Sequence, residues 1–431
     1  METVEGIYTI GLRFARGLLP LLSRGEGKLA RGIRGRRSAP DRLVAWAERE
    51  RDPVRPLVWF HAPSVGEGLQ AGAVMDALLE RRPDAQIVYT YFSPSAERLA
   101  SRLPAAVAGY LPIDLPDTLR PVFDALDPSV IAFSRTEVWP NLTRIAADRG
   151  VPTLLLNATL PARSSRLREP TRSLLAPAHR RLLRVGAISE ADAQRFRRLD
   201  VPPERLLVMG DARFDQVARR AAAADRGGNL LRSLAGERPT VVAGSTWPED
   251  EEPLSAAFAS LPGASSRYRM ILVPHEPVEA HLLGLERTLD RIGHEHVRLG
   301  RRRPDVGDPP VIIVDRVGIL GDLYALADVA YVGGGFGTAG LHSVLEPAAF
   351  GVPVLFGPRH SGAREAAEMV ECGAAYAVAD QVDLGRTLAR LLTNAEPRLE
   401  AGAAAARYIA AGLGAADRGA GLIMEALGGD G

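Results

Sequence analysis

The stretch VAYVGGGFGTAGLHSVLEP, residues 329–347, decides the fold of this chain. It opens on the apolar run Val329–Val332, which is typical of a buried strand, and five glycines follow between positions 333 and 340. A glycine-rich turn between a strand and a helix lets backbone N–H groups and the helix dipole approach an anion. Glycines can instead serve only close packing of a helix on a sheet, but so many in one turn favour a ligand. The stretch therefore predicts a strand–turn–helix unit that binds an anion.

The spacing of Gly335, Gly337 and Gly340 also matches the fingerprint of a dinucleotide-binding turn. That interpretation is rejected because the next predicted strand ends at Phe356 without an Asp or Glu that would bind a ribose. Glu346, expected one turn into the following helix, is better placed to accept hydrogen bonds from ribose hydroxyls. We therefore expect a nucleotide whose phosphate lies on the glycine turn.

Short apolar runs alternate with helical segments on both sides of this stretch, which indicates parallel strands joined by helical crossovers. The predicted strands of the first half are Leu57–Phe60, Ile87–Tyr91, Val130–Phe133, Thr153–Leu156, Val185–Ile188 and Leu206–Met209. Those of the second half are Thr240–Ala243, Met270–Val273, Val311–Val314, Val329–Val332 and Val352–Phe356. The predicted fold class is α/β, with two doubly wound parallel sheets that face each other across a ligand-binding cleft.

Length and composition agree with two globular domains. The 431 residues are 46% hydrophobic and 24% charged, which argues against a disordered chain and a multi-span membrane protein. The Ala-rich stretch Ala221–Gly228 is the predicted linker, so we place domains at residues 38–222 and 223–431. A net charge of +1 gives no global case for nucleic-acid binding. The single cysteine, Cys372, excludes an internal disulfide.

Residues 1–37 differ from the rest of the chain. An apolar stretch that Arg13 and Arg16 interrupt is followed by a basic stretch, and it is too short and too charged to span a membrane. The apolar residues are Ile7, Ile10, Leu12, Phe14, Leu18, Leu19, Leu21 and Leu22, and the basic ones are Arg24, Lys28, Arg31, Arg34, Arg36 and Arg37. Two interpretations stay open: a membrane-associating segment that lies against anionic lipid, and a helix that packs on its own domain.

Carboxylates follow two predicted strands of the first half. The chain leaves Leu57–Phe60 through a Pro/Gly turn, and Glu67 comes in the first turn of the next helix. A helix N-terminus stabilises an ionised carboxylate, which suits a base that accepts a proton from a hydroxyl, although such residues also commonly cap helices. Glu137 follows Val130–Phe133 beside Trp139, whose ring can bind a sugar face or seal the core. Alternatively, Glu137 has only a structural role and forms an ion pair with an arginine.

Polar residues also follow two predicted strands of the second half. Ser245 and Thr246 lead into an acidic helix start, where hydroxyls and backbone donors hold a phosphate or merely cap the helix. The pair His275-Glu276 ends the next strand, and His281 lies further along its helix. This spacing offers no third metal ligand, so we predict neither a metal nor a cofactor.

Seven blocks of the sequence, taken in order, resemble one known family. In the first half they are HAPSVGE at 61–67, LPIDLP at 111–116, TEVWPN at 136–141 and NA at 157–158. GDARFD at 210–215 is the fifth block. The last two lie in the second half and are GSTWP at 244–248 and the glycine block at 333–347. Together they resemble the 3-deoxy-D-manno-octulosonic acid (Kdo) transferases of lipopolysaccharide biosynthesis, and the similarity runs from Trp59 to about Val378.

The resemblance implies a GT-B fold of two Rossmann-like domains and an inverting transfer of Kdo from CMP-Kdo to a hydroxyl of a lipid A precursor. It implies that Glu67 is the catalytic base and that the acceptor is bound by Ser64, Gly66, Glu137 and Trp139. It implies that CMP is bound by Ser245, Thr246, Pro274, His275, Gly334, Gly335, Phe336, Gly337, Ser343 and Glu346. The expected location is the cytoplasmic face of the bacterial inner membrane, with an anionic lipid surface as a further partner and no nucleic acid.

Three positions depart from the family's pattern. Many members carry Pro-Arg-His where this chain has Pro274-His275-Glu276, an Asn at Ser343, and a His at Trp247. The cationic phosphate contact of the missing arginine then falls to His275 or to a nearby arginine. Two other functions stay open: a GT-B enzyme that uses a UDP-sugar on another lipid or glycan, and a non-catalytic nucleotide-binding relative.

Overall fold

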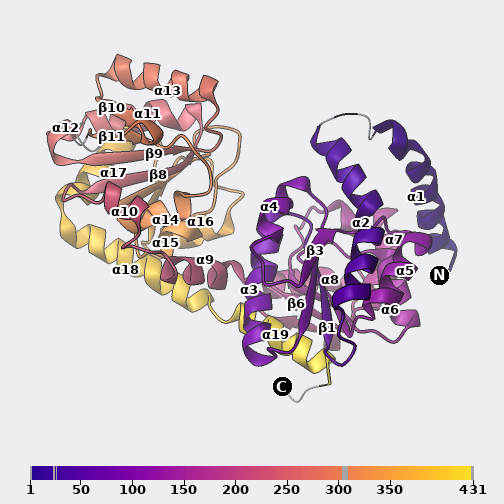
Figure 1. Ribbon diagram of the computed structural model, residues 1–431. Coiled ribbons are helices and arrows are strands. Elements are labelled where there is room, and N and C mark those ends of the chain that lie inside the picture. Colours follow the sequence, from indigo (N-terminus) through magenta and orange to yellow (C-terminus); the bar gives the residue numbers. More distant parts are fainter. Residues whose placement is uncertain (1, 23–24, 26, 303–308, 429–431) are drawn as a thin grey trace. The chain divides into compact units, whose positions relative to one another are not determined.

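The computed structural model describes residues 2–22, 25, 27–302 and 309–428 (Figure 1). The chain forms two compact units: Met1–Gln216 with Gly412–Gly431, and Val217–Ala411. Each unit contains one seven-stranded parallel sheet. The predicted α/β fold class of the GT-B type, with two doubly wound sheets, is confirmed.

The strands of the first unit are β1 (Leu57–His61), β2 (Gln86–Tyr91), β3 (Val107–Tyr110), β4 (Val130–Ser134), β5 (Thr153–Ala158), β6 (Arg184–Ala187) and β7 (Leu206–Val208). Its helices are α1 (Glu2–Leu22), α2 (Lys28–Glu50), α3 (Val65–Arg81), α4 (Glu97–Ala100), α5 (Pro116–Leu126), α6 (Pro140–Asp148), α7 (Thr171–Arg180), α8 (Glu190–Arg197) and α19 (Ala415–Ala426). Helix α9 (Arg213–Ala222) begins in this unit and continues into the second.

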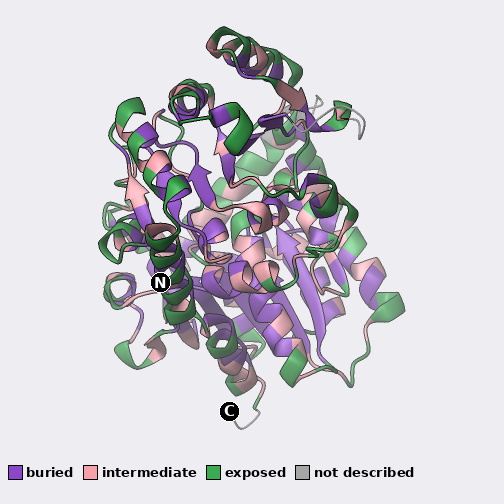
Figure 2. Cartoon of the chain, turned by 90° about the vertical axis from the view of Figure 1, so that its left-hand side faces the viewer, coloured by how far each residue is buried: buried purple, intermediate pink, exposed green. Residues whose placement is uncertain are grey.

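The first sheet has the strand order β3-β2-β1-β4-β5-β6-β7. Its central strands are buried on both faces, as a parallel sheet between two helix layers requires (Figure 2). Leu57 and Trp59 of β1 pack in a cluster with α2 and α5 to α8. Val58 and Phe60 point the other way and pack with α3 and α19.

The strands of the second unit are β8 (Thr240–Thr246), β9 (Arg269–Pro274), β10 (His296–Arg298), β11 (Val311–Ile313), β12 (Val329–Val332), β13 (Val354–Phe356) and β14 (Ala375–Ala377). Its helices are α10 (Asn229–Leu234), α11 (Pro248–Ala259), α12 (Ala264–Arg267), α13 (Glu279–Ile292), α14 (Leu320–Leu323), α15 (Leu345–Ala348), α16 (Arg364–Glu371), α17 (Gln381–Thr393) and α18 (Ala395–Gly412).

The second sheet has the order β10-β11-β9-β8-β12-β13-β14. Successive crossovers run in opposite directions from β1 and from β8, so each sheet has a switch point, between β1 and β4 in one and between β8 and β12 in the other. The carboxyl ends of the strands at a switch point form a crevice in which doubly wound folds bind ligands. Most candidate residues singled out by the sequence follow these four strands, and Pro274 and His275 end or follow β9, the neighbour of β8.

The predicted domain boundaries need correction at three places. Position 37 lies inside the continuous helix α2, and the predicted linker begins inside α9. The predicted second domain, residues 223–431, loses its last helix to the first unit. Helix α19 packs against α3, β4 and β5, because Ala420 and Ile423 complete the apolar cluster on that face of the first sheet.

Candidate functional site

Glu67 lies at the switch point of the first sheet. Strand β1 ends at His61, Ser64 caps α3, and Glu67 stands in the first turn of that helix. The Ser64 hydroxyl donates a hydrogen bond to Glu67 Oε2, and Arg135 Nη1 lies 3.5 Å from Glu67 Oε1. A Cβ added to Gly66 would have no other atom of the described residues within 4 Å apart from its own turn and helix backbone, so this side of the turn is open. The helix N-terminus and Arg135 both stabilise a carboxylate here.

Strand β4 delivers the second carboxylate. Arg135, directly after β4, has a φ of 72°, a left-handed conformation that is uncommon outside glycine and concentrates at functional sites. Glu137 follows, and burial raises its pKa, as does the charge of Glu67. Arg166 Nη2 lies 3.9 Å from Glu137 Oε1 and opposes this shift. The two carboxylates therefore interact electrostatically, and their environments differ.

A cavity of about 350 Å³ opens beside Glu137, and we call it the Glu137 pocket. Its walls come from α1, the turn before α6, and α7. Tyr8, Trp139 and Arg166 line it with Glu137. The pocket thus combines an aromatic wall with a carboxylate and a guanidinium, which is the chemistry that binds sugar hydroxyls.

Five side chains around this switch point have a buried polar atom with no hydrogen-bond partner among the described residues: Arg36 Nε, His61 Nε2, Ser134 Oγ, Glu137 Oε2 and Trp139 Nε1. Buried polar atoms are normally paired, because an unpaired one costs about 1–3 kcal/mol. The rings are neighbours: the His61 and Trp139 centroids lie 6.1 Å apart, and Trp139 stacks on Phe92 at 5.8 Å. Arg36 covers Phe92, with Cζ 3.2 Å from the ring centroid.

The hydrogen bonds of Thr90 assign the tautomer of His61. The Thr90 hydroxyl donates to the carbonyl of Phe60 and accepts from Trp59 Nε1, so His61 Nδ1, at 3.1 Å, is a donor to it. Burial lowers the pKa of His61 to about 3. The ring is therefore neutral, and Nε2 carries a lone pair that is free to accept a hydrogen bond.

In the second unit, Ser245 and Thr246 differ in availability. Ser245 has a φ of 53°, where β8 shifts its register against β9, and its hydroxyl forms no hydrogen bond within the described residues. The buried Thr246 hydroxyl donates to Glu251 Oε1 at 2.9 Å, and His281 Nε2 lies 3.0 Å from the same carboxylate. The donor of the Thr246 hydroxyl is therefore used inside the protein, whereas the Ser245 hydroxyl is available to a ligand.

The glycine turn is fastened to Asp250, a residue that sequence reasoning passed over. The buried Asp250 carboxylate accepts hydrogen bonds from the amides of Gly334 (2.8 Å) and Phe336 (3.2 Å) and from the Tyr331 hydroxyl (2.9 Å). The amides of Gly335 and Gly337 form no hydrogen bond within the described residues. The amides of Gly334 and Phe336 are therefore already paired inside the protein, and CMP binding by the four residues of the turn stays a prediction.

Two glycines of the turn are also required because other backbone segments pack closely against them. Gly334 has a φ of +94°, and a Cβ there would lie 2.0 Å from the carbonyl oxygen of Gly340. A Cβ on Gly335 would lie 2.5 Å from the amide nitrogen of Gly357. The alternative reading of the turn, close approach of backbone segments, thus applies to these two positions.

No helix follows the turn directly, contrary to the prediction. Residues 333–344 are irregular, and α15 begins only at Leu345 and has four residues. Glu346 is therefore in the first turn of a short helix and not one turn into a long one. Its half-buried carboxylate has a pKa raised by burial and forms no hydrogen bond within the described residues. Ser343 is exposed beside it.

Three aromatic rings stack at the carboxyl ends of β8, β9 and β12. The His275 and His342 centroids lie 4.4 Å apart, and those of Trp247 and His275 lie 4.9 Å apart. Trp247 Nε1 donates to His342 Nε2 at 3.0 Å, so that nitrogen carries no proton. Burial lowers the pKa of His342. Pro274, which ends β9, precedes this stack.

Arg359 adds a cation to the glycine turn. Its amide donates to the carbonyl of Gly335 at 2.9 Å, and Nη1 donates to the carbonyl of Gly337 at 3.2 Å. Sequence reasoning did not single out Arg359, because only the pairing of β12 with β13 brings this residue to the turn. That an arginine replaces the one missing from Pro274-His275-Glu276 stays a prediction. Within the described residues no group of three or more His, Cys, Asp or Glu side chains could hold a metal ion.

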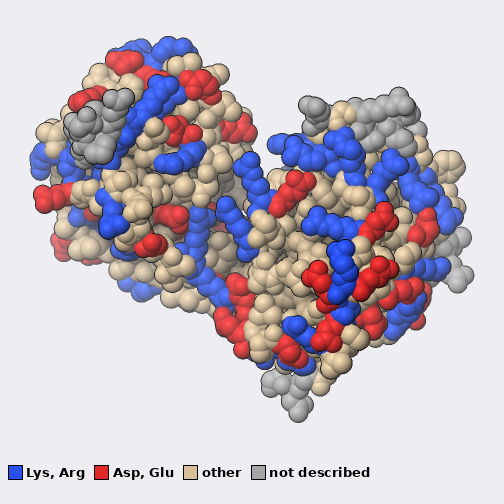
Figure 3. Space-filling view, in the orientation of Figure 1, with Lys and Arg blue, Asp and Glu red and all other residues tan. Residues whose placement is uncertain are grey.

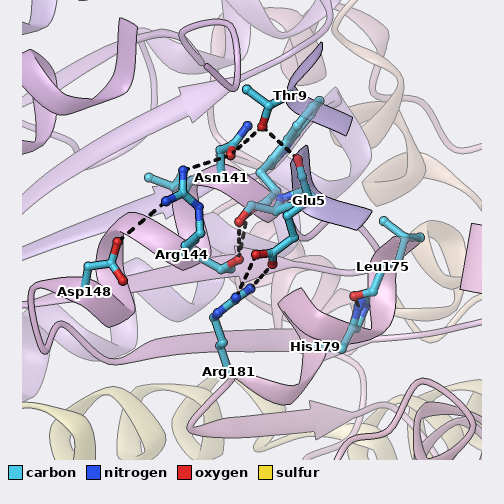
Figure 4. A network of polar contacts seen from close by, with 12 residues as sticks. Glu5, Thr9, Asn141, Arg144, Asp148, Leu175, His179 and Arg181 are labelled. Atoms are coloured by element: carbon cyan, nitrogen blue, oxygen red, sulfur yellow. Dashed lines mark hydrogen bonds and ion pairs between the residues drawn. The ribbon is translucent and has the colours of Figure 1, made fainter. Parts of the chain in front are cut away.

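Helix α1 packs on the first unit through polar side chains. Tyr8 donates to Asp114 Oδ2 at 3.0 Å. Figure 4 shows that Thr9 donates to Asn141 Oδ1, at 3.1 Å, and that Arg181 donates to Glu5 through Nη1 and Nη2. Ile7, Ile10 and Phe14 instead face solvent, with 66%, 54% and 77% exposure. Among the described residues no helix is long and apolar enough to cross a membrane. The structure thus shows that the helix packs on its own domain and leaves Ile7, Ile10 and Phe14 exposed, and association with a membrane stays a prediction. Leu18, Leu21 and Leu22 lie outside the described side chains.

Comparisons with known proteins bear on the family and the fold. Residues 37–216 match the family model described as 3-Deoxy-D-manno-octulosonic-acid transferase (kdotransferase). The chain is similar to the 3-deoxy-D-manno-octulosonic acid transferase of Bordetella pertussis, with 29% identity over 98% of this chain and 100% of that protein. The transferase of Haemophilus influenzae shares 28% identity over 84% of this chain and 85% of its own length.

Two solved structures share the fold. The UDP-GlcNAc 2-epimerase of Neisseria meningitidis, bound to UDP-GlcNAc, has a TM-score of 0.61 and 12% identity over 86% of this chain and 99% of its own. A glycosyltransferase of Rickettsia africae has a TM-score of 0.57 and 10% identity, again over 86% and 99%. At this identity the likeness extends to the fold alone.

Proposed function

The chain belongs to the Kdo transferase family of lipopolysaccharide synthesis and is a glycosyltransferase, and we propose on that premise that it moves Kdo from CMP-Kdo to a hydroxyl of a lipid A precursor. The observation that carries the proposal is the set of five unpaired buried polar atoms at the switch point of the first sheet, one of which is Glu137 Oε2. A sugar acceptor supplies hydroxyls that pair with such atoms, whereas a protein that only bound a nucleotide would have no use for them.

Glu67 acts as the general base in this proposal. The acceptor hydroxyl gives its proton to Glu67, its oxygen forms a bond to the anomeric carbon of Kdo from the face opposite CMP, and the bond from that carbon to the phosphate oxygen breaks. The configuration therefore inverts. Ser64 fixes the carboxylate through its hydrogen bond, and Arg135 stabilises the charged form.

Glu137, Trp139 and His61 position the acceptor. His61 Nε2 accepts a hydrogen bond from an acceptor hydroxyl, and Trp139 Nε1 donates one to a hydroxyl oxygen. Glu137 accepts through its unpaired Oε2. Gly66 leaves room for the acceptor beside Glu67.

The second unit holds CMP in this proposal. The Ser245 hydroxyl, the amides of Gly335 and Gly337, and Arg359 bind the phosphate, because these donors and this cation gather at the glycine turn. Glu346 accepts hydrogen bonds from the ribose, with Ser343 beside it. His275 and Pro274 border the pyrimidine side, where the stack with Trp247 supplies an aromatic face.

Helix α1 rests on the cytoplasmic face of the bacterial inner membrane in this proposal. An amphipathic helix normally buries its apolar face in its own protein, but α1 turns Ile7, Ile10 and Phe14 outward. Lys and Arg side chains gather over the part of the first unit that carries α1 and α2 (Figure 3). Apolar side chains beside basic ones are the combination that binds an anionic lipid surface.

The test is incubation of the purified chain with CMP-Kdo and a tetra-acylated lipid A precursor, with products identified by mass. We expect products heavier by Kdo units, and Glu67→Gln should lower kcat about a hundredfold or more, because the proton acceptor is lost. Thermal-shift titration with CMP should give the same shift in Glu67→Gln as in the wild type, since the CMP site lies in the other unit.

Three results contradict parts of the proposal. Stabilisation by UDP or UMP but not CMP would identify a UDP-sugar enzyme. CMP binding without transfer to any lipid acceptor would identify a non-catalytic relative. Unchanged transfer in Glu67→Gln would remove the base assignment while leaving the transferase activity.

A further inference from the structure

A second cavity lies under helix α1 and shares no lining residue with the Glu137 pocket. Its volume is about 720 Å³, and it lies between α1, the start of α5, the middle of α6 and the segment after α7. Its charged lining consists of four arginines and two acids: Arg13, Arg120, Arg144, Arg181, Glu5 and Asp148. We call it the arginine cavity.

The acids neutralise only two of the four arginines. Arg181 donates to Glu5 through Nη1 and Nη2 (Figure 4), and both side chains of this pair are largely buried. Arg144 contacts Asn141 Oδ1 at 3.3 Å and lies 3.8 Å from Asp148.

The remaining arginines, Arg13 and Arg120, have no partner in the cavity. Neither forms a hydrogen bond or an ion pair among the described residues. The nearby carboxylate of Asp117 does not line the cavity and is bound by Arg16. Burial raises the pKa of Asp117, but the hydrogen bond from Arg16 and the charges of Arg16 and Arg13 lower it, so Arg13 interacts with this carboxylate at longer range. Arg13, Arg16 and Arg120 together share the one carboxylate of Asp117, which leaves two positive charges beside the cavity and suits an anion of charge −2.

The rim of the cavity is apolar on the side of α1. Ile10 lines the cavity and is 54% exposed. Ile7 and Phe14 continue the same face of the helix toward solvent. A ligand that entered here would meet guanidinium groups inside and hydrocarbon at the opening, so it would itself be an amphiphile with an anionic head.

We propose that the arginine cavity binds the phosphomonoester of a phosphorylated lipid headgroup, and that it holds the phosphate of the acceptor while an acceptor hydroxyl occupies the Glu137 pocket. This assignment rests on the proposed function, because it names a further subsite for the same acceptor. Guanidinium groups bind phosphate oxygens in pairs of parallel hydrogen bonds, so two unpartnered arginines suit a dianionic phosphate. The volume exceeds that of one phosphate and leaves room for part of the sugar that carries it.

Vesicle flotation of the full chain tests the cavity without any donor sugar. The probes are phosphatidylcholine vesicles that contain phosphatidic acid, a phosphomonoester, or phosphatidylglycerol, a phosphodiester, at matched zeta potential. We expect the wild type to bind phosphatidic acid vesicles about tenfold more tightly, and millimolar inorganic phosphate to remove the difference.

The matched variants are Arg120→Gln and Arg37→Gln. Both remove one exposed positive charge, but Arg37 lies on α2 outside the cavity. Arg120→Gln should bring the ratio of the two affinities to about one, and Arg37→Gln should weaken binding to both vesicles and leave the ratio unchanged. Phe14→Ser should likewise weaken both equally, because it removes only apolar contact.

Two outcomes overturn the proposal. Equal binding of the wild type to both vesicles, or an equal effect of Arg120→Gln and Arg37→Gln on the ratio, would mean that the basic surface adsorbs to membranes without a phosphate site. If Arg120→Gln lowers the thermal midpoint, Arg120→Lys is used in its place. This variant keeps the positive charge but lacks the planar guanidinium that forms paired hydrogen bonds with a phosphate, so it should still lower the ratio of the two vesicle affinities.

Failure of the cavity and failure of the proposed function are separable. If the protein prefers phosphatidic acid but transfers no Kdo, the phosphate site in the arginine cavity is supported and the proposed function is contradicted. If the protein transfers Kdo and Arg120→Gln leaves the acceptor KM unchanged, the proposed function is supported and the phosphate site in the arginine cavity is contradicted.

Discussion

Glu137 is held where its charge is costly. Burial and the neighbouring Glu67 both raise its pKa, and Arg166 and Arg36 offset this only in part. Glu67, in contrast, has a helix N-terminus and Arg135 beside it. Two carboxylates with different surroundings can take different roles at one site. We therefore assign the base to Glu67 and acceptor binding to Glu137.

Glu137→Gln should stabilise the protein at the expense of activity. The pKa of Glu137 is raised in the folded state, so its ionisation destabilises the fold as pH rises through the ordinary glutamate range toward the raised value, and the penalty stays at higher pH. We expect the variant to raise the thermal midpoint at pH 8 and to leave it nearly unchanged at pH 4. Its transfer rate should fall about tenfold or more, through a higher acceptor KM.

The control for this prediction is Glu48→Gln, an exposed glutamate on α2. It should shift the midpoint little at either pH. A stabilisation by Glu137→Gln that is equal at pH 4 and pH 8 would contradict the charge explanation.

Single residues show where sequence reasoning ends. Glu67 and Glu137 could be found because each follows an apolar run that reads as a strand. The role of His61 could not, because its tautomer depends on Thr90, a residue of the neighbouring strand. Arg36 reaches the site from α2, and no spacing in the sequence announces that contact.

At the scale of elements, eleven strands could be predicted and three could not. The missed strands, β3, β10 and β14, all lie at sheet edges. An edge strand is covered less completely than a central one, so it needs no continuous apolar run, and sequences such as His296–Arg298 and Ala375–Ala377 carry none. The central strands were predictable because they are buried on both faces.

The glycine turn depends on α11 through Asp250. An oxygen of this buried carboxylate accepts from Gly334 and the other from Phe336 and Tyr331. Asp250→Asn replaces one of the two accepting oxygens with an NH2 group, which is itself a donor. At least one hydrogen bond to the carboxylate is therefore lost, and the NH2 group faces another donor of the turn.

We expect Asp250→Asn to lower the free energy of unfolding by about 2–4 kcal/mol and to weaken CMP binding at least tenfold. Denaturant unfolding and CMP titration measure the two effects. Glu252→Gln, an exposed residue of the same helix that pairs with the exposed Arg291, is the control and should change neither strongly. Retained CMP affinity in Asp250→Asn would show that the turn does not form the phosphate site.

At the scale of the whole molecule, the chain returns to its first unit to finish it. The predicted boundary at residue 222 follows composition, but the end of the chain carries no compositional sign that α19 leaves the second unit. Its alternation of small and apolar residues suits either sheet. Specific contacts decide the matter: Asp215 accepts hydrogen bonds from the amides of Gly414 (2.7 Å) and Ala416 (3.0 Å), which fixes the start of α19 against the first unit.

This arrangement predicts that a substitution near the end of the chain acts on its beginning. Ile423 is fully buried in the cluster that contains Val58 and Leu78, so Ile423→Ala should cost about 2–5 kcal/mol. Hydrogen exchange should then accelerate in peptides of β1 to β5 and remain unchanged in those of β8 to β13. Leu388→Ala, an equally buried residue of α17, should give the reverse pattern, because it packs in the cluster around β8 and β9. Faster exchange in the second unit of Ile423→Ala would mean that α19 stabilises both sheets, and the two units would then unfold as one.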